Sequence, residues 1–142
     1  MYESEKDELY QAIEAANRAI LNLEQAEDYL SRAGDWGILD FMGGELITGI
    51  MKHRRMNDAG QELELARQSV LEFKDQLADV DELEDINVDT DDFRGFADLF
   101  LDGFLSDWMM QSRIREARLQ VRTAIGKIRR IRGQLEDCVS LL

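Results

Sequence analysis

Four side chains with the chemistry to hold a metal ion fall in two segments of this chain: Asp40, His53, Asp98 and Asp102. Asp98 and Asp102 are four residues apart, so on a helix they share one face. Hard divalent cations prefer carboxylate oxygens. If the two segments pack together, these residues predict a divalent metal or small-ligand site. The alternative is that these carboxylates cap helices or pair with basic neighbours, namely Lys52, Arg54, Arg55 and Arg94.

Other catalytic chemistry has little support in the residue types. His53 is the single histidine and Cys138 the single cysteine, so the chain lacks a His/His zinc set and the paired Glu-x-x-His elements of di-iron bundles. We therefore expect no cofactor, unless Asp40, His53, Asp98 and Asp102 form the divalent metal site described above. The sequence favours a non-enzymatic protein and leaves enzymatic activity undecided.

The composition predicts an all-α domain. The 142 residues contain no proline, the residue that most often interrupts helices, and 44% of them are hydrophobic. Thirty acidic and seventeen basic residues give a net charge of -13. This length suits one domain, 1-142, with a core that needs no disulfide.

Three apolar seams with alternating three- and four-residue steps predict a bundle of three long antiparallel helices. We expect the first helix at about residues 3–33. The second seam runs over 59–80 behind a possible cap at Asn57 and Asp58, and the third runs over 114–142 behind one at Ser106 and Asp107. Glu27 interrupts the first seam, and we expect it to reach solvent or to meet an arginine of the last helix.

Two segments between the seams are predicted as short helical connectors. Residues 34–56 hold five of the ten glycines, and residues 93–108 hold four phenylalanines and Trp108. Glycine marks turns or close backbone approach, and aromatic surfaces of this size require burial. We expect the connectors to pack together, which would also assemble the carboxylate-lined site.

Charge is unevenly distributed. Residues 108–142 carry eight basic and three acidic side chains in an otherwise acidic chain. We expect these basic residues to face acidic neighbours across the bundle, such as Glu24, Asp28, Glu62 and Glu72. The acidity of the rest of the chain argues against nucleic acid as a partner.

Gly126 and Gly133 lie seven residues apart with Leu119 on the back of the last helix. A glycine inside a helix lowers its stability by about 0.5–1 kcal/mol relative to alanine. Two glycines on one face therefore indicate that another element approaches this face closely. The sequence predicts a second contact face at Leu119, Gly126 and Gly133, filled by the aromatic connector or by another copy of the chain. The expected partner is therefore a homo-oligomer, most simply a dimer, or another protein.

Three observations in the sequence predict where in the cell the protein resides. The first eight residues lack a basic start and an apolar stretch, which argues against a signal peptide, and one cysteine suits a reducing compartment. The apolar segment 36–51 contains Asp40 and Glu45, so burial in the bundle is favoured over a membrane surface. We expect a cytoplasmic protein without a membrane partner.

Three strings resemble a pattern in uncharacterised all-helical bacterial proteins: Trp36–Gly44, Lys52-His53 and Phe100–Trp108. The resemblance implies a helical fold and a bacterial cytoplasmic source. It implies no activity and assigns no catalytic residue.

Overall fold

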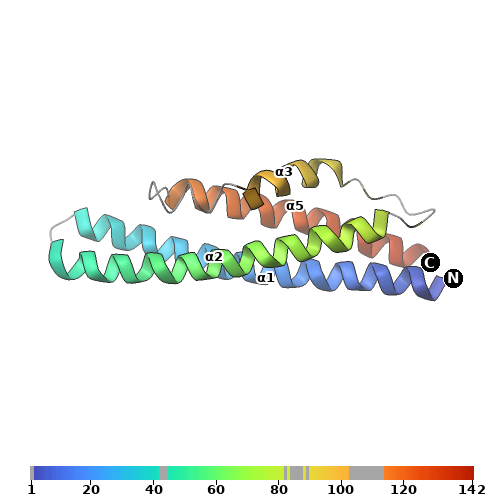
Figure 1. The fold of residues 1–142 in the computed structure, drawn as a ribbon, viewed down its shortest axis with the longest axis horizontal. Coiled ribbons are helices and arrows are strands. Elements are labelled where there is room, and N and C mark those ends of the chain that lie inside the picture. Colours follow the sequence, from blue (N-terminus) through green and yellow to red (C-terminus); the bar gives the residue numbers. More distant parts are fainter. Residues whose placement is uncertain (1, 42–44, 82, 84–87, 89, 103–113) are drawn as a thin grey trace.

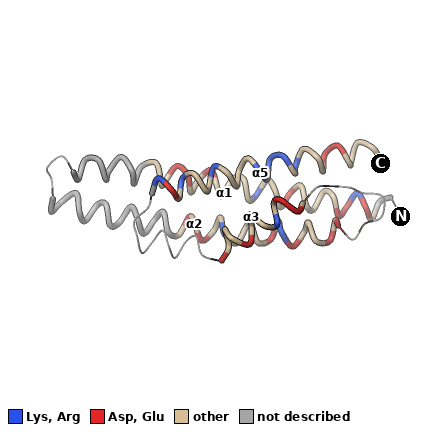
Figure 2. The backbone as a smooth tube through the Cα atoms, turned by 90° about the horizontal axis from the view of Figure 1, so that it is seen from above, with Lys and Arg blue, Asp and Glu red and all other residues tan. Residues whose placement is uncertain are grey.

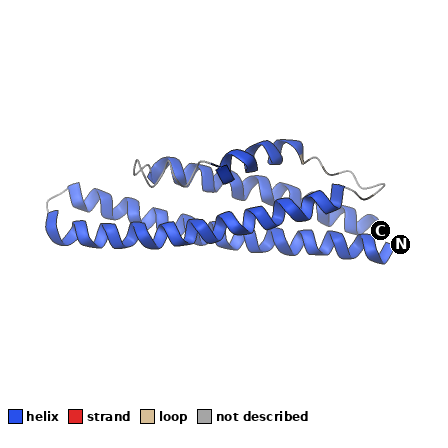
Figure 3. Cartoon of the chain, viewed as in Figure 1, coloured by secondary structure: helices blue, strands red, loops and turns tan. Residues whose placement is uncertain are grey.

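The computed structural model describes the backbone of residues 2–41, 45–81, 83, 88, 90–102 and 114–142, and the side chains of 4–31, 61–81, 83, 88, 90–102 and 115–142. These ranges contain four helices and no strand (Figures 1 and 3). The helices are α1 (Tyr2–Phe41), α2 (Glu45–Asp81), α3 (Asp91–Asp102) and α5 (Ile114–Leu141). The predicted all-α bundle is confirmed. Within the described ranges, no helix combines the length and apolar character that a bilayer span requires.

The helices pack in a closed ring in which successive neighbours run antiparallel. α1 contacts α2 and α5, and α3 contacts α2 and α5, so α1 and α3 lie diagonally across the bundle. The short α3 therefore forms the fourth side of a four-helix bundle along part of its length. α1 begins and α5 ends at the same end of the bundle (Figure 1).

The predicted seams form the core. Leu23 and Leu30 of α1, Phe73 of α2 and Ile128 of α5 are all fully or almost fully buried. The alanine stripe beside the first seam is buried too, at Ala12, Ala19 and Ala26. Small side chains there let α1 and its neighbours approach closely. Heptad-like periodicity thus predicted which side of each long helix faces inward.

The expected helix boundaries are wrong around the first connector. Residues 34–41 continue α1 and residues 45–56 begin α2, so this segment is mostly helix, and Asn57 and Asp58 lie inside α2 rather than capping it. Each glycine lowers helix stability by only about 1 kcal/mol, and with no proline the helices continue through Gly34, Gly37 and Gly49. The side chains of Trp36 and Trp108 lie outside the described residues.

The described part of the second connector, residues 93–102, is helical as expected, but it packs as a helix of the bundle. α3 begins with Asp91 and Asp92, whose charges suit the positive end of the helix dipole. The preceding Thr90 is buried, and its hydroxyl donates a hydrogen bond to Asp81 of α2 (3.2 Å). The Phe93 ring meets Phe73 edge to face at 5.3 Å between ring centroids. These contacts fix the start of α3 against α2.

Candidate functional site

The proposed carboxylate site is only partly within the described residues. Asp98 lies on α3 and its carboxylate pairs with the Lys74 ammonium of α2 at 2.5 Å. Asp102 is exposed at the last position of α3. Asp40 falls in the last turn of α1 and His53 in α2, and both side chains lie outside the described residues.

Among the described side chains, no three His, Cys, Asp or Glu residues converge as a metal ion requires. The contacts of α3 with α2 that the structure defines involve Arg67, Phe73, Lys74 and Asp81, all far along α2 from His53. Asp98 thus follows the alternative expectation of pairing with a basic neighbour, although its partner is Lys74 and not one of the four residues named from the sequence.

The second predicted site, the solvent-facing side of α5, is fully described. Leu119 is 57% exposed. A Cβ added to Gly126 or Gly133 would meet no described atom within 4 Å. Neither glycine is therefore required by close packing inside the described chain, and α3 does not fill the space above them. The cost of two glycines in a helix interior remains unexplained by the fold of one chain.

A pocket of about 130 Å³ opens beside Gly126, between α5 and the first turn of α3. Its walls also include Asp92 and Phe93 of α3 and Lys127, Arg130 and Ile131 of α5. The Lys127 ammonium binds the Asp92 carboxylate at 2.6 Å and lies 5.6 Å from the centre of the Phe96 ring. Lys127 therefore attaches α3 to α5 through both charge and an aromatic face.

The pKa of one carboxyl at this pocket, that of Asp92, is shifted. The hydrogen bond from Lys127, followed by the charges of Lys127 and Arg130, lowers the pKa of Asp92 below its ordinary value. Asp92 is thus held ionised, as an ion-paired helix residue is, which differs from the raised pKa of a general acid. The pocket wall carries both signs of charge and offers no uniform anion or cation site.

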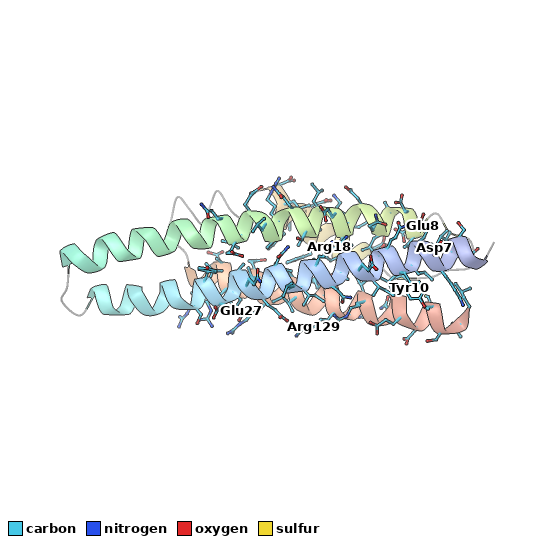
Figure 4. All side chains as sticks on the ribbon, turned by 90° about the horizontal axis from the view of Figure 1, so that it is seen from below. Asp7, Glu8, Tyr10, Arg18, Glu27 and Arg129 are labelled. Carbon is cyan, nitrogen blue, oxygen red and sulfur yellow. The ribbon has the colours of Figure 1, made fainter. Side chains whose placement is uncertain are left out.

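Basic residues of α5 form ion pairs with acidic residues of α1, as the uneven charge distribution of the sequence predicted. Arg129 binds Glu24 at 2.5 Å, and Arg122 binds Glu27. Arg132 donates a hydrogen bond to the Asn17 side-chain oxygen at 2.9 Å. Figure 4 shows Glu27 and Arg129 where α1 and α5 lie side by side. An acidic and polar stripe on α1 therefore runs along a basic stripe on α5.

Two of the expected acidic partners behave differently. Glu72 lies 3.8 Å from Arg18 of α1, on the opposite border of α1 (Figure 4). Glu62 has a buried carboxylate oxygen without a hydrogen-bond partner among the described residues. The prediction that Glu72 faces the last helix is wrong, because this residue lies where α2 packs on α1.

Sequence reasoning missed the contacts that hold α3. Arg67 of α2 donates a hydrogen bond to the Leu101 carbonyl at the end of α3 (3.1 Å), and Arg94 pairs with Asp81. The available signal was the Asp91-Asp92 pair ahead of an aromatic helix, which indicates a helix start. It does not indicate which neighbours the helix contacts, because those partners lie 13 or more residues away.

The comparisons with known proteins identify no relatives. No protein-family model, no curated protein and no solved structure matches the chain. The resemblance seen in the sequence is thus confirmed only in the all-helical fold that it implied.

Proposed function

We propose that this chain is a non-enzymatic interaction protein whose contact with another protein is made by the solvent-facing side of α5. The observation that carries this proposal is the open space above Gly126 and Gly133 beside the exposed Leu119. Helix interiors favour alanine over glycine, so two bare positions on one face suit a surface that another helix approaches closely.

The surroundings of this face support the same function. Specific interfaces combine a small apolar centre with a polar rim, and arginine is enriched in them. Leu119 gives an apolar centre, and Arg115, Arg122 and Arg129 flank it at seven-residue spacing, the last two where α5 borders α1. A cytoplasmic location and a coiled-coil-like assembly of long helices belong to this proposal, on the grounds of the single cysteine and the seam periodicity.

A photo-crosslinking experiment tests the proposal. A photoreactive phenylalanine replaces Leu119, and the matched control carries it at Leu65 of α2, which is comparably exposed. After irradiation in cells that contain the chain, we expect covalent protein adducts from the Leu119 position and few from the Leu65 position. Adding Gly126→Leu and Gly133→Leu should abolish the adducts. Equal adducts from both positions, or adducts insensitive to the glycine substitutions, would contradict the proposal.

A further inference from the structure

One stripe of α1 lies along the basic side of α5 and can be followed residue by residue. Asn17, Leu21 and Glu24 follow at steps of four and three, which keeps them on one side of α1. Asn17 contacts Arg132 and Glu24 contacts Arg129, so this side borders α5. Leu21, between them, is 56% exposed. An apolar side chain thus stands in the middle of a polar stripe.

The same two contacts fix the height of Leu21 along the bundle. Asn17 is level with Arg132 and Glu24 is level with Arg129, within the reach of the arginine side chains. Because α1 and α5 are antiparallel, Leu21 stands at the height of Arg130 of α5. The open positions Gly126 and Gly133 lie just to either side of that height.

Four residues of α5 at this height have the spacing of a helix-packing hole. A knob from a facing helix inserts among residues i, i+3, i+4 and i+7, and here these are Gly126, Arg129, Arg130 and Gly133. The two glycines leave the centre of the hole open. Arg129, which already binds Glu24 of its own chain, and Arg130, which lies near Asp92, supply positive charge at its sides, where further acidic neighbours of an incoming apolar knob would be favoured.

We infer that the occupant of this hole is Leu21 of a second copy of the chain, in a two-fold dimer whose axis runs parallel to the helices. This inference rests on the proposed function and names its partner. Rotation about such an axis lays α1 of each copy on α5 of the other and preserves height along the bundle. Leu21 therefore arrives at the partner's Gly126–Gly133 hole, and the partner's Glu24 arrives beside Arg129 and Arg130.

Charge complementarity selects this arrangement. Basic residues predominate along α5, several of them visible in Figure 2, and acidic residues predominate along α1. A two-fold axis perpendicular to the helices would instead lay α1 on α1 and α5 on α5, bringing like charges together, which is unfavourable at an interface. In the parallel-axis dimer the predominantly acidic α1 faces the predominantly basic α5 of the other copy, and each knob and hole is used twice, as an isologous interface requires.

Disulfide trapping between separately labelled chains tests the arrangement. Both chains carry Cys138→Ala; one carries Leu21→Cys and the other Gly133→Cys. Mixed oxidation should give mainly the Leu21→Cys/Gly133→Cys heterodimer. The matched control replaces Leu21→Cys with Leu99→Cys on α3, a still more exposed leucine at 78%, and should give no excess of heterodimer. An excess of Leu21→Cys homodimers would overturn the arrangement.

Native mass of the unmodified chain gives the second readout. We expect two chains per particle, and we expect Leu21→Glu to raise the dimer dissociation constant by about tenfold or more, as the loss of a central interface residue does. Leu99→Glu should leave it unchanged. A single chain at every concentration overturns the dimer but leaves the proposed function intact if the Leu119 adducts contain another protein. Loss of those adducts as well overturns both.

Discussion

Glu27 of α1 and Arg122 of α5 form an ion pair at a step where the apolar seam of α1 would otherwise continue from Leu23 to Leu30. The Glu27 side chain is 25% exposed and that of Arg122 is 55% exposed. The pair therefore sits at the edge of the core, where the arginine can stay hydrated if its partner is removed.

Glu27→Leu should raise the free energy of unfolding by about 1 kcal/mol. The leucine extends the apolar seam, and the largely exposed Arg122 pays little for losing its partner. Urea denaturation monitored by circular dichroism measures the change. Glu14→Leu, at an exposed position of α1, is the control and should not raise the free energy of unfolding. A loss of stability in Glu27→Leu would show that the ion pair contributes more than the apolar contact.

Phe93→Ala should lower the free energy of unfolding by about 3–5 kcal/mol, because it empties a buried site and removes the edge-to-face contact with Phe73. Leu99→Ala on the exposed side of the same helix should change it by less than about 0.5 kcal/mol. Similar losses in both variants would mean that α3 is not docked on α2 through Phe93.

Gly126→Ala and Gly133→Ala should each raise the stability of the single chain by about 0.5–1 kcal/mol. The added methyl meets no described atom, so only the gain in helix propensity remains. Denaturation at low protein concentration measures this gain without interference from assembly. The same substitutions should weaken self-association, and this opposite effect separates a role in assembly from a role in folding. Destabilisation of the dilute protein would show that another part of the chain fills this space.

Acid should weaken the attachment of α3 to α5. The pKa of Asp92 is lower in the native state than in the unfolded chain, so its pairing with Lys127 stabilises the fold above the ordinary carboxyl pKa. That contribution disappears as the pH falls through the lowered native pKa. The stability difference between the native sequence and Asp92→Asn, measured in urea, should therefore be present at pH 7 and vanish in strong acid. Asp102→Asn is the matched control and should show no comparable difference, and a pH-independent effect of Asp92→Asn would contradict this account.

Cys138 should react slowly with alkylating reagents at neutral pH. Partial burial, and then the charge of Asp137, raises the pKa of its thiol, which reduces the thiolate that reacts. The pH at which the iodoacetamide rate is half-maximal should lie above that of the chain unfolded in urea. Asp137→Asn should lower that pH slightly. A midpoint at or below the unfolded value would contradict the burial of this sulfur.

The sequence predicted the inward faces of the long helices better than their lengths. Residues such as Leu63, Val70 and Leu77 repeat with the period of the helix, so their common burial follows from spacing alone. The ends of α1 and α2 could not be read this way, because Gly34, Gly37 and Gly49 weaken a helix without terminating it. Only the continuous backbone shows that the helices extend through them.

The candidate sites show the same contrast between features that residue spacing predicts and features that it does not. The exposure of Leu119 and Gly126 was predictable because these residues lie opposite the seam on one helix. The pairing of Asp98 with Lys74 was not, since it depends on how α3 crosses α2. The spacing of residues shows on which side of its own helix a residue lies. Contacts between helices that are distant in the sequence depend on the tertiary arrangement, which spacing does not give.

The start of α1 and the end of α5 lie at one end of the bundle, and this has a mechanical consequence (Figure 1). A force that pulls these two ends apart peels α1 from α5 turn by turn, so only a few contacts bear the load at any moment. Such unzipping yields at lower tension than sliding whole helices past each other. A load applied between these two ends would therefore open the bundle from this end, one helical turn after another.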